Sequence, residues 1–375
     1  MDMVIKRAVP GDIDRLGQLS DRVFRPTLVP GTGMPLEFGP MFSSTNAANL
    51  YFAADVDEPV CLVGMMPGIV QVGSARISVA SMGSVCTLAN YRKRQLASAA
   101  IEQILQDFSM STSVLLVSGD LSIYRRIGCV TFGNYLSMSV PRGRGQSSDG
   151  IVIDTTLPER VADEATRVYQ AERLRFSRTP AQMASLLATL RAPHFRATAT
   201  PPQMFVARLR QEVVAYAIAL PSQDGVAHLL EWAGARSALP ALLEAAMRHF
   251  DCAQAQLYVE PEDFSARAIL HDRETVSTPC ENQGTIRILN PDLLIKESQP
   301  WVEERYGARV RLLEVRQDEW KVSWEGGDNE RAGASPLRID ADGKILKGFG
   351  DLSRFFFGRD GLDLPLPRTD DLNYI

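Results

Sequence analysis

The pattern of apolar and polar positions predicts a chain that mixes β-strands and helices along its whole length. Apolar residues alternate or form short runs where strands are expected, and recur every three or four positions where helices are expected. The most regular helix is predicted at 94–108, where Leu96, Ala100, Ile104 and Phe108 fall on one face. In the first 140 residues, strands are predicted at 3–8, 50–54, 59–66, 68–72, 75–80, 84–88, 113–117 and 130–138, further helices beginning near Asp12 and at 120–127, and a loop or broken helix at 26–46.

Residues 141–150 are polar and rich in glycine, which predicts a linker. A second unit follows with a similar order of elements but no sequence repeat, and a third begins near Gly284. We therefore expect an α/β fold with mixed sheets, divided into domains at 1–142, 150–283 and 284–375. In the later units, helices are predicted at 159–173, 180–191, 238–250, 291–306 and 349–358, and strands at 203–208, 212–220, 226–233, 254–260 and 285–289, with two or three more strands around Trp320 and Trp324.

The composition is that of an ordinary soluble globular protein, with 375 residues, 45% hydrophobic and 23% charged. A net charge of -5 argues against general nucleic-acid binding. The uncharged stretch 61–75 is interrupted by glycines and a proline and is too short to cross a bilayer, which takes about 20 apolar residues. The first residues contain no apolar run typical of a signal peptide, so we expect a cytoplasmic protein that binds neither membrane nor nucleic acid.

Charge and cysteine placement narrow the chemistry further. Residues 1–145 hold 13 basic against 11 acidic residues, and the remainder holds 27 against 34, so the basic excess lies in the first third. The five cysteines are widely spaced and form no CxxC pair, which predicts reduced, buried thiols and no structural metal site.

The segment 84–132 carries the candidate chemistry. A predicted strand (SVCTL) runs through ANYRKRQL into the helix 94–108, so a basic turn leads directly into a helix start. Unpaired amides and the helix dipole favour an anion there, and Arg92, Lys93 and Arg94 add charge. A pyrophosphate fits this chemistry, although a solvated basic turn without a ligand fits the local pattern equally well.

These residues resemble a known family. GSVCTLANYRKRQLASAAI is similar to the coenzyme-A-binding motif of the GNAT superfamily of acetyltransferases, and YRRIGCVTFG is similar to its second motif. The order of units, ending in one that resembles a sterol carrier protein, is similar to the enhanced-intracellular-survival (Eis)-type acetyltransferases. The resemblance is specific at 84–132 and rests on order and length beyond residue 150.

The resemblance implies that acetyl-CoA binds as co-substrate, with its pantetheine arm lying like an extra strand between two splayed strands. In this chain one departure affects the pyrophosphate loop, because Gln95 stands where the family has glycine, whereas Ala97 keeps the second small position. The implied cofactor-binding residues are Val85, Cys86, Thr87, Arg92, Lys93, Arg94, Gln95, Leu96, Ala97, Ser98, Gly119 and Asp120.

The resemblance also implies the catalytic groups. Tyr124 would protonate the departing thiolate, and we expect Arg125, Arg126 and the helix dipole to lower its pKa from about 10. The C-terminal carboxylate of Ile375 would act as the base. The alternatives are a tyrosine that only packs and a frayed tail.

The predicted function is an acetyl-CoA-dependent N-acetyltransferase, in which a primary amine of a small molecule attacks the thioester directly. No metal is expected, and a homo-oligomer is left open. The alternative is a GNAT-derived protein without turnover that binds a ligand, such as a lipid in its third unit. Packing is the expected role of Trp301, Trp320 and Trp324, and the cysteines and histidines are expected to be structural.

Overall fold

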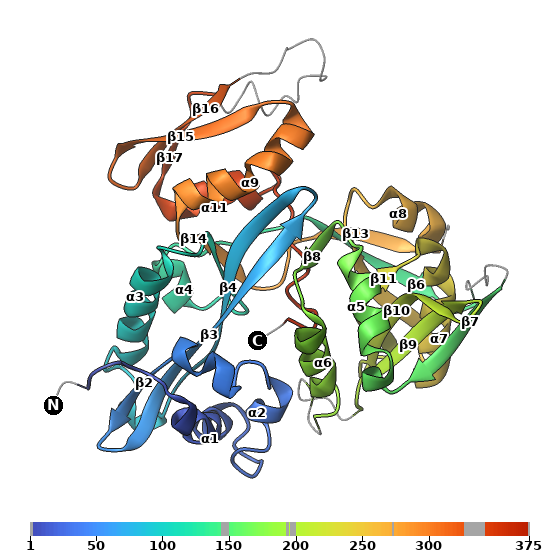
Figure 1. The fold of residues 1–375 in the computed structure, drawn as a ribbon, viewed down its shortest axis with the longest axis horizontal. Helices are drawn as coiled ribbons and strands as arrows, with labels where there is room; N and C mark the ends of the chain where they lie inside the picture. The colour runs from blue at the N-terminus through green and yellow to red at the C-terminus, as the bar shows by residue number, and fades with distance from the viewer. Residues whose placement is uncertain are drawn as a thin grey trace.

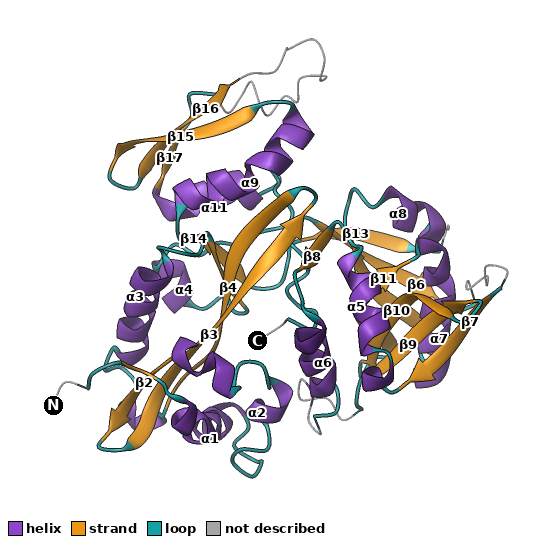
Figure 2. Ribbon diagram, viewed as in Figure 1, coloured by secondary structure: helices purple, strands orange, loops and turns teal. Residues whose placement is uncertain are grey.

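The computed structural model describes residues 3–143, 150–192, 195, 200–271, 274–325 and 342–373. Within these ranges the chain forms three β-sheets, with helices on their faces (Figure 1). The predicted α/β class with mixed sheets is confirmed, because parallel and antiparallel strand pairs occur in the same sheet. Figure 2 shows helices and strands alternating through all three parts of the molecule.

The first sheet has the order β1-β2-β3-β4-β5-β14, with β8 also paired to β3. β4 and β5 run parallel, and the other pairs are antiparallel. The strands are β1 (Lys6–Arg7), β2 (Leu50–Asp55), β3 (Glu58–Val72), β4 (Ala75–Thr87), β5 (Val114–Val117), β8 (Leu174–Phe176) and β14 (Thr285–Ile288).

A long hairpin of β3 and β4 replaces four shorter predicted strands. Pro67 and Gly68 suggested a break, but β3 continues through them, paired to β4 along its length. On its other edge, β3 pairs with β2 up to Gly64 and with β8 from Val70. Pro67 therefore lies in a stretch that no strand covers on this side, where its missing amide hydrogen costs no ladder bond.

Helices cover both faces of this sheet. α1 (Ile13–Phe24) and α2 (Met34–Glu37) pack on one face, and α3 (Leu96–Phe108) and α4 (Ser122–Arg126) pack on the other. The segment 26–46, expected to be irregular, is fixed by the buried carboxylate of Asp21. This group accepts hydrogen bonds from the amides of Gly31, Gly33 and Met34 at 2.7, 3.0 and 2.5 Å. Three backbone donors thus hold a segment that has little regular structure.

The second sheet has the order β13-β6-β12-β11-β10-β9-β7, with α5 and α6 on one face and α7 and α8 on the other. Its strands are β6 (Tyr135–Pro141), β7 (Ile151–Thr156), β9 (Gln203–Leu209), β10 (Glu212–Pro221), β11 (Val226–Gly234), β12 (Gln254–Val259) and β13 (Val276–Cys280). Its helices are α5 (Ala162–Gln170), α6 (Pro180–Thr189), α7 (Leu239–Phe250) and α8 (Phe264–Leu270).

Strands cross between the two sheets. β6 precedes the predicted linker yet lies between β12 and β13, and β14 follows the predicted boundary at Gly284 yet forms the edge of the first sheet beside β5. The predicted strand 130–138 therefore divides. Val130 makes an isolated bridge to Ile286, and a regular strand begins only at Tyr135, after Gly133 with a φ of 80°. The predicted linker is described only at 141–143 and at Gly150.

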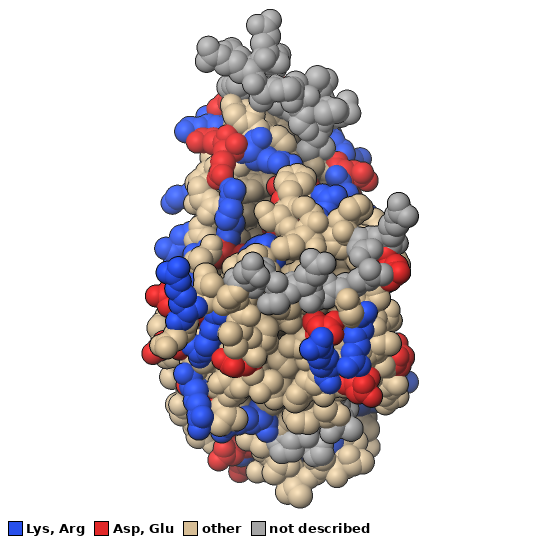
Figure 3. Space-filling model, turned by 90° about the vertical axis from the view of Figure 1, so that its right-hand side faces the viewer, with Lys and Arg blue, Asp and Glu red and all other residues tan. Residues whose placement is uncertain are grey.

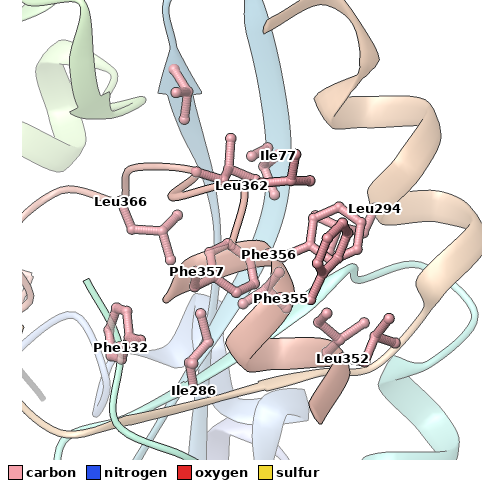
Figure 4. Close-up of a cluster of buried hydrophobic side chains, with 14 of the residues drawn as sticks. Ile77, Phe132, Ile286, Leu294, Leu352, Phe355, Phe356, Phe357, Leu362 and Leu366 are labelled. Carbon is pink, nitrogen blue, oxygen red and sulfur yellow. The ribbon is translucent and has the colours of Figure 1, made fainter. Parts of the chain in front are cut away.

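The third sheet packs on the end of the long hairpin. It contains β15 (Arg309–Arg316), β16 (Glu319–Glu325) and β17 (Ile345–Lys347). Along the chain, α9 (Pro291–Tyr306) precedes these strands and α11 (Gly348–Phe357) follows them. Figure 4 shows how side chains of the hairpin, β14, α9 and α11 meet in one core, with Ile77, Ile286 and Phe356 among them. Trp301 and Trp320 are buried in this core, and Trp324 is partly buried against it, so the packing role predicted for them is confirmed.

Candidate active site

The parallel strands β4 and β5 separate part-way along their length. They pair from Val79 with Val114 to Met82 with Val117, where β5 ends. β4 then bends at Ser84, whose φ is 49°, and continues to Thr87 paired only with β3. In the described part of the chain, no strand pairs with the other edge of residues 85–87. Such an edge can accept an extended ligand.

The side chains of Val85, Cys86 and Thr87, which lie on this open stretch of β4, have different surroundings. The Cys86 side chain is 4% exposed and packs against α1 and its neighbours, and burial raises the pKa of its thiol. Val85 is partly buried against the α3 side, and the Thr87 hydroxyl lies 3.3 Å from the Cys61 sulfur. Their backbone edge is therefore the part that can bind a ligand. The predicted structural role of Cys86 is confirmed, and that of Cys129, 3% exposed, is too.

The basic turn delivers unpaired amides at the start of α3. The first backbone bond of this helix runs from the Ala99 amide to the Gln95 carbonyl, at 2.9 Å. The amides of Leu96, Ala97 and Ser98 precede it and have no partner within the helix, and no side chain caps them. The start of α3 thus presents hydrogen-bond donors and the positive end of the helix dipole.

Gln95 adopts the backbone conformation that glycine would favour. Its φ and ψ are 61° and 12°, in the left-handed region, and its side chain is exposed. The strain of this conformation is about 1 kcal/mol for a residue with a Cβ atom. Lys93, two positions earlier, has a φ of 62°. Gln95 in place of glycine therefore changes the side chain at this position, but the backbone of the turn keeps a conformation that glycine could also adopt.

The basic side chains of the turn are exposed, and within the described residues none of Arg92, Lys93 and Arg94 forms an ion pair. Arg92 Nε donates to the carbonyl of Thr87 at 3.2 Å, at the end of the open strand edge. The Arg94 guanidinium lies 4.9 Å from the ring centre of Tyr91. The turn therefore holds positive charge that is not neutralised by protein carboxylates.

Tyr124 lies in α4, the short helix that follows β5 along the chain. It is 6% exposed, and its ring packs on Gly119, where an added Cβ would be 3.2 Å from ring carbon Cε2. Burial raises the pKa of Tyr124 to about 12. Our expectation of a lowered pKa was wrong, because Arg125 pairs with Asp120 (Nε to Oδ1, 2.7 Å) and does not offset the cost of burying a phenolate.

Burial also raises the pKa of a thiol in the cluster that contains Tyr124. Cys129 lies in the same buried cluster as Tyr124, and burial raises the pKa of its thiol to about 12. A thiolate released into this cluster would also be a stronger base than in water, because desolvation disfavours both anions. If Tyr124 were to give a proton to a thiolate in this cluster, the transfer would be closer to balanced than the ordinary pKa values of about 10 and 8.5 suggest.

The C-terminal segment is fixed as far as it is described, to Asn373. Leu362, Leu364, Leu366 and Leu372 are at most 5% exposed. Asp371 is anchored by Arg178 in a buried group, in which Arg178 donates to both carboxylate oxygens of Glu231 at 2.9 and 2.7 Å. Tyr374 and Ile375 lie outside the described residues, so the predicted base remains a prediction.

No family model matches the sequence, and no curated protein matches it. Solved structures match its fold. A GCN5-related N-acetyltransferase from Anabaena variabilis has a TM-score of 0.62 at 13% sequence identity, and the match covers 94% of this chain and 96% of that chain. Eis1 from Mycobacterium abscessus has a TM-score of 0.59 at 15% identity, covering 93% and 99%. A GCN5-related N-acetyltransferase from Kribbella flavida has a TM-score of 0.58 at 15% identity, covering 79% and 73%.

This chain has the GNAT fold. Its two larger sheets are built alike, since each has a parallel strand pair joined through a helix, β4 and β5 through α3 and β11 and β12 through α7. The basic turn is found only in the first, where RKRQ precedes α3, whereas GARSA precedes α7. The open strand edge, the unpaired helix amides and the buried tyrosine thus gather in the first unit of the GNAT fold.

A cavity of about 490 Å³ lies on the opposite face of the sheet from α3. Because side chains alternate along a strand, Ala80 and Met82 face α3, whereas Val79 and Ser81 face the cavity. Ser81 directly precedes Met82, whose pairing with Val117 is the last before the strands separate. A ligand in this cavity would therefore reach the gap from the face opposite α3.

The walls of the cavity come from segments far apart in the sequence. One wall is the stretch of β3 around Pro67 that no strand covers, another is α2 with the 3₁₀ segment Ser44–Asn49, and a third is α6. Leu372 and Asn373 also line it, so the described part of the C-terminal segment reaches this cavity. The sequence analysis missed this site and the group that anchors Asp371, because 53 residues separate Arg178 from Glu231 and no local pattern joins them.

Other candidate chemistry is sparse. Among the described residues there is no group of three or more His, Cys, Asp or Glu side chains placed to hold a metal ion. None of the helices in the described ranges has the length and apolar character needed to span a membrane. On the face shown in Figure 3, basic side chains are interspersed with acidic ones, and no continuous basic field is seen.

Proposed function

We propose that this chain is an N-acetyltransferase that takes its acetyl group from acetyl-CoA. The observation that carries the proposal is the position of the gap between β4 and β5, which opens beside the unpaired amides at the start of α3. The pantetheine arm would lie along residues 85–87, with the pyrophosphate on the amides of Leu96–Ser98 and near Arg92 and Arg94. Gly119 and Asp120 would flank the thioester.

In the proposed reaction, the amine nitrogen attacks the thioester carbonyl carbon directly. A C–N bond forms, the C–S bond breaks, and the electron pair of that bond stays on sulfur as a thiolate. Tyr124 gives its proton to this sulfur, and the nitrogen loses a proton to a base. We propose the terminal carboxylate of Ile375 as that base, which is supported by the anchoring of Asp371 and by Leu372 and Asn373 lining the cavity. An α-carboxylate is weak in water, with a pKa of about 3.5, so a buried or water-relayed position is required.

The finer relationship to Eis-type enzymes, with a third unit similar to a sterol carrier protein, is part of the proposal. It is supported by the order of the units and by a structural match to Eis1 that covers most of both chains. The proposed acceptor is a small-molecule amine and the proposed compartment is the cytoplasm. We keep the proposed domain boundaries at 142–150 and at 284 as divisions of the sequence. In space, β6 belongs to the sheet of the second unit and β14 to the sheet of the first.

The alternative of a binding protein without turnover is less well supported. A lipid site in the third unit would need the tryptophans to line a cavity. They pack instead against aromatic neighbours, with ring centres 5.9 Å apart for Trp301 and Tyr306 and 5.3 Å apart for Trp320 and Phe349.

Calorimetric titration with acetyl-CoA, combined with thiol release in the presence of amines, tests the proposal. Binding should weaken as salt rises from about 50 to 300 mM, because exposed charges are screened. The double variant Arg92→Glu and Arg94→Glu should abolish binding without a loss of fold stability. The charge-matched control is Arg160→Glu with Arg210→Glu, two exposed positions in the second unit. Equal affinity in both double variants would remove the basic turn from the site.

A further inference from the structure

The charged side chains described in the lining of the 490 Å³ cavity are already paired within the protein. Among the described residues, two charged side chains line it, Glu37 and Arg178. Glu37 is paired with Arg25 (Oε2 to NH2, 2.6 Å), and Arg178 is paired with Glu231 and lies 3.5 Å from Asp371. All five side chains are at most 20% exposed, so these pairs are held in place and shielded from water. Among the described residues, the lining therefore offers no unpaired carboxylate to a second ammonium group.

The rest of the lining is apolar or neutral. Its bulk comes from Phe38, Met41, Met66, Ile69, Phe176 and Leu186. Several of its polar groups are used within the protein, because Asn46 donates to the carbonyls of Met41 and Met65 at 2.9 and 3.1 Å. The hydroxyl of Ser81, on the strand next to the gap, remains as a group that could meet a single amine.

A ligand that enters this cavity must lose water from its charged groups. A polycation would bring several ammonium groups beside apolar side chains. The carboxylates nearby are already paired with arginines and cannot pair with these groups as well, and each unpaired buried charge costs free energy. An amine on an apolar body would bury that body against the aromatic and aliphatic lining, and its one nitrogen would lie near Ser81. The cavity volume is within the range of about 300–1,000 Å³ that small-molecule sites have.

We propose that the acceptor is a primary amine carried on an apolar body without a second positive charge, bound in this cavity between β3–β4 and α6. This inference rests on the proposed function, since it names the class of amine that the acetyl group reaches. It excludes polyamines and other polycations as the preferred acceptors, even though the chain carries an acidic excess after residue 145. That excess lies elsewhere than in the described lining.

Matched amines test the proposal directly. Hexylamine and hexamethylenediamine have the same carbon chain and differ by one ammonium group, and octylamine with octamethylenediamine repeats the comparison in a longer pair. With acetyl-CoA saturating, thiol release should give a kcat/KM at least tenfold higher for each monoamine than for its diamine. Equal or better turnover of the diamines overturns the proposal. So does a lack of turnover with all four amines while acetyl-CoA binds.

A designed carboxylate makes the test independent of amine reactivity. Ser185→Glu adds a negative charge to the α6 wall, at an exposed position that lines the cavity. It should raise the ratio of the diamine's kcat/KM to the monoamine's kcat/KM at least fivefold. The affinity for acetyl-CoA should be unchanged. Ala184→Glu, an exposed neighbour on the same helix that is not part of the lining, is the control and should not change the ratio. An unchanged ratio in Ser185→Glu overturns the assignment of the cavity. Failure of acetyl-CoA to bind at all would instead overturn the proposed function.

Discussion

The carboxylate of Asp371 lies 3.5 Å from the guanidinium of Arg178, and both side chains are at most 7% exposed. Arg178 also pairs with Glu231, and its guanidinium lies over the ring of Tyr169, 4.0 Å from the ring centre. The second unit thereby holds the C-terminal segment beside a cavity whose other walls come from the first unit and from α6 of the second. Three parts of the chain thus define the candidate acceptor site.

Replacing Asp371 tests this anchor. Asp371→Ala should cost about 1–3 kcal/mol in the free energy of unfolding, because the ion pair and the bonds that Asn373 donates to Asp371 are lost. If the tail takes part in the reaction, turnover should also fall at least tenfold, with acetyl-CoA affinity unchanged. Urea denaturation and thiol-release assays measure the two effects. Asp360→Ala, at an exposed carboxylate earlier in the same segment, should change neither. Full activity in Asp371→Ala would argue against a catalytic tail.

Glycine at position 95 should suit the turn. Gln95→Gly removes the strain of the left-handed conformation, about 1 kcal/mol, so the melting temperature should be equal or higher. Coenzyme A should bind equally or more tightly. Lys93→Gly relieves a similar conformation but also removes a charge, and should weaken binding. A tenfold loss in Gln95→Gly, about 1.4 kcal/mol, would mean that the glutamine side chain itself contacts the ligand.

Tyr124→Phe should lower turnover by about 100- to 10,000-fold, since a general acid contributes rate increases of this size. Acetyl-CoA affinity should be unchanged, because the phenol acts in the transition state. Tyr51→Phe is the control, as Tyr51 lies in the same core cluster but bonds to Asp107 at 2.8 Å. It should keep its turnover.

The raised pKa of Tyr124 adds a dependence on pH to this prediction. With a pKa of about 12, the phenol stays protonated to about pH 11, so this group should cause no loss of rate between pH 7 and 10. A fall in turnover with an apparent pKa below 10 that disappears in Tyr124→Phe would contradict the burial described for the ring.

Glu260 should make stability depend on pH. Burial raises the pKa of its carboxyl from 4.5 to about 8, with Asp263 and Glu172 adding repulsion and Arg236 opposing it. The neutral form is favoured in the folded state, so its contribution is complete below pH 4.5 and is lost as pH rises through 8. Glu260→Gln should therefore raise the free energy of unfolding by about 2 kcal/mol at pH 9 and leave it unchanged at pH 4. Denaturation at both pH values measures this, with Glu262→Gln, at an exposed position, as the control.

Local patterns predicted most elements, because their periodicity is set by which face is buried. The helix at 94–108 and the basic turn before it illustrate this, as does the helix predicted at 291–306. The long hairpin was predicted as four strands, with breaks at Pro67, at the turn after Val72 and at residues 81–83. Whether a proline breaks a strand depends on whether another strand pairs with its nitrogen side, and the local sequence does not show which strands will pair.

The site could be predicted only where one segment carries it. The open edge of residues 85–87 and the amides after Gln95 are contiguous, so their chemistry is readable from the sequence. The cavity is not, because Pro67, α6 and Leu372 meet only through tertiary packing. The pKa of Tyr124 depends in the same way on burial and on the pairing of Arg125 with Asp120, and side-chain type alone suggested the opposite direction.

The placement of β14 has a consequence for the order of events during synthesis. β5 is covered on its outer edge by residues 285–288, so the sheet that contains the gap between β4 and β5 stays incomplete until some three-quarters of the chain has left the ribosome. Until then, β5 presents an unpaired, apolar edge (VLLV) to any other strand. Contacts this distant in sequence also slow folding, since a large loop must close before they form. A nascent chain that stalls before residue 285 is therefore expected to need a chaperone, and the first unit is not expected to be stable as an isolated fragment.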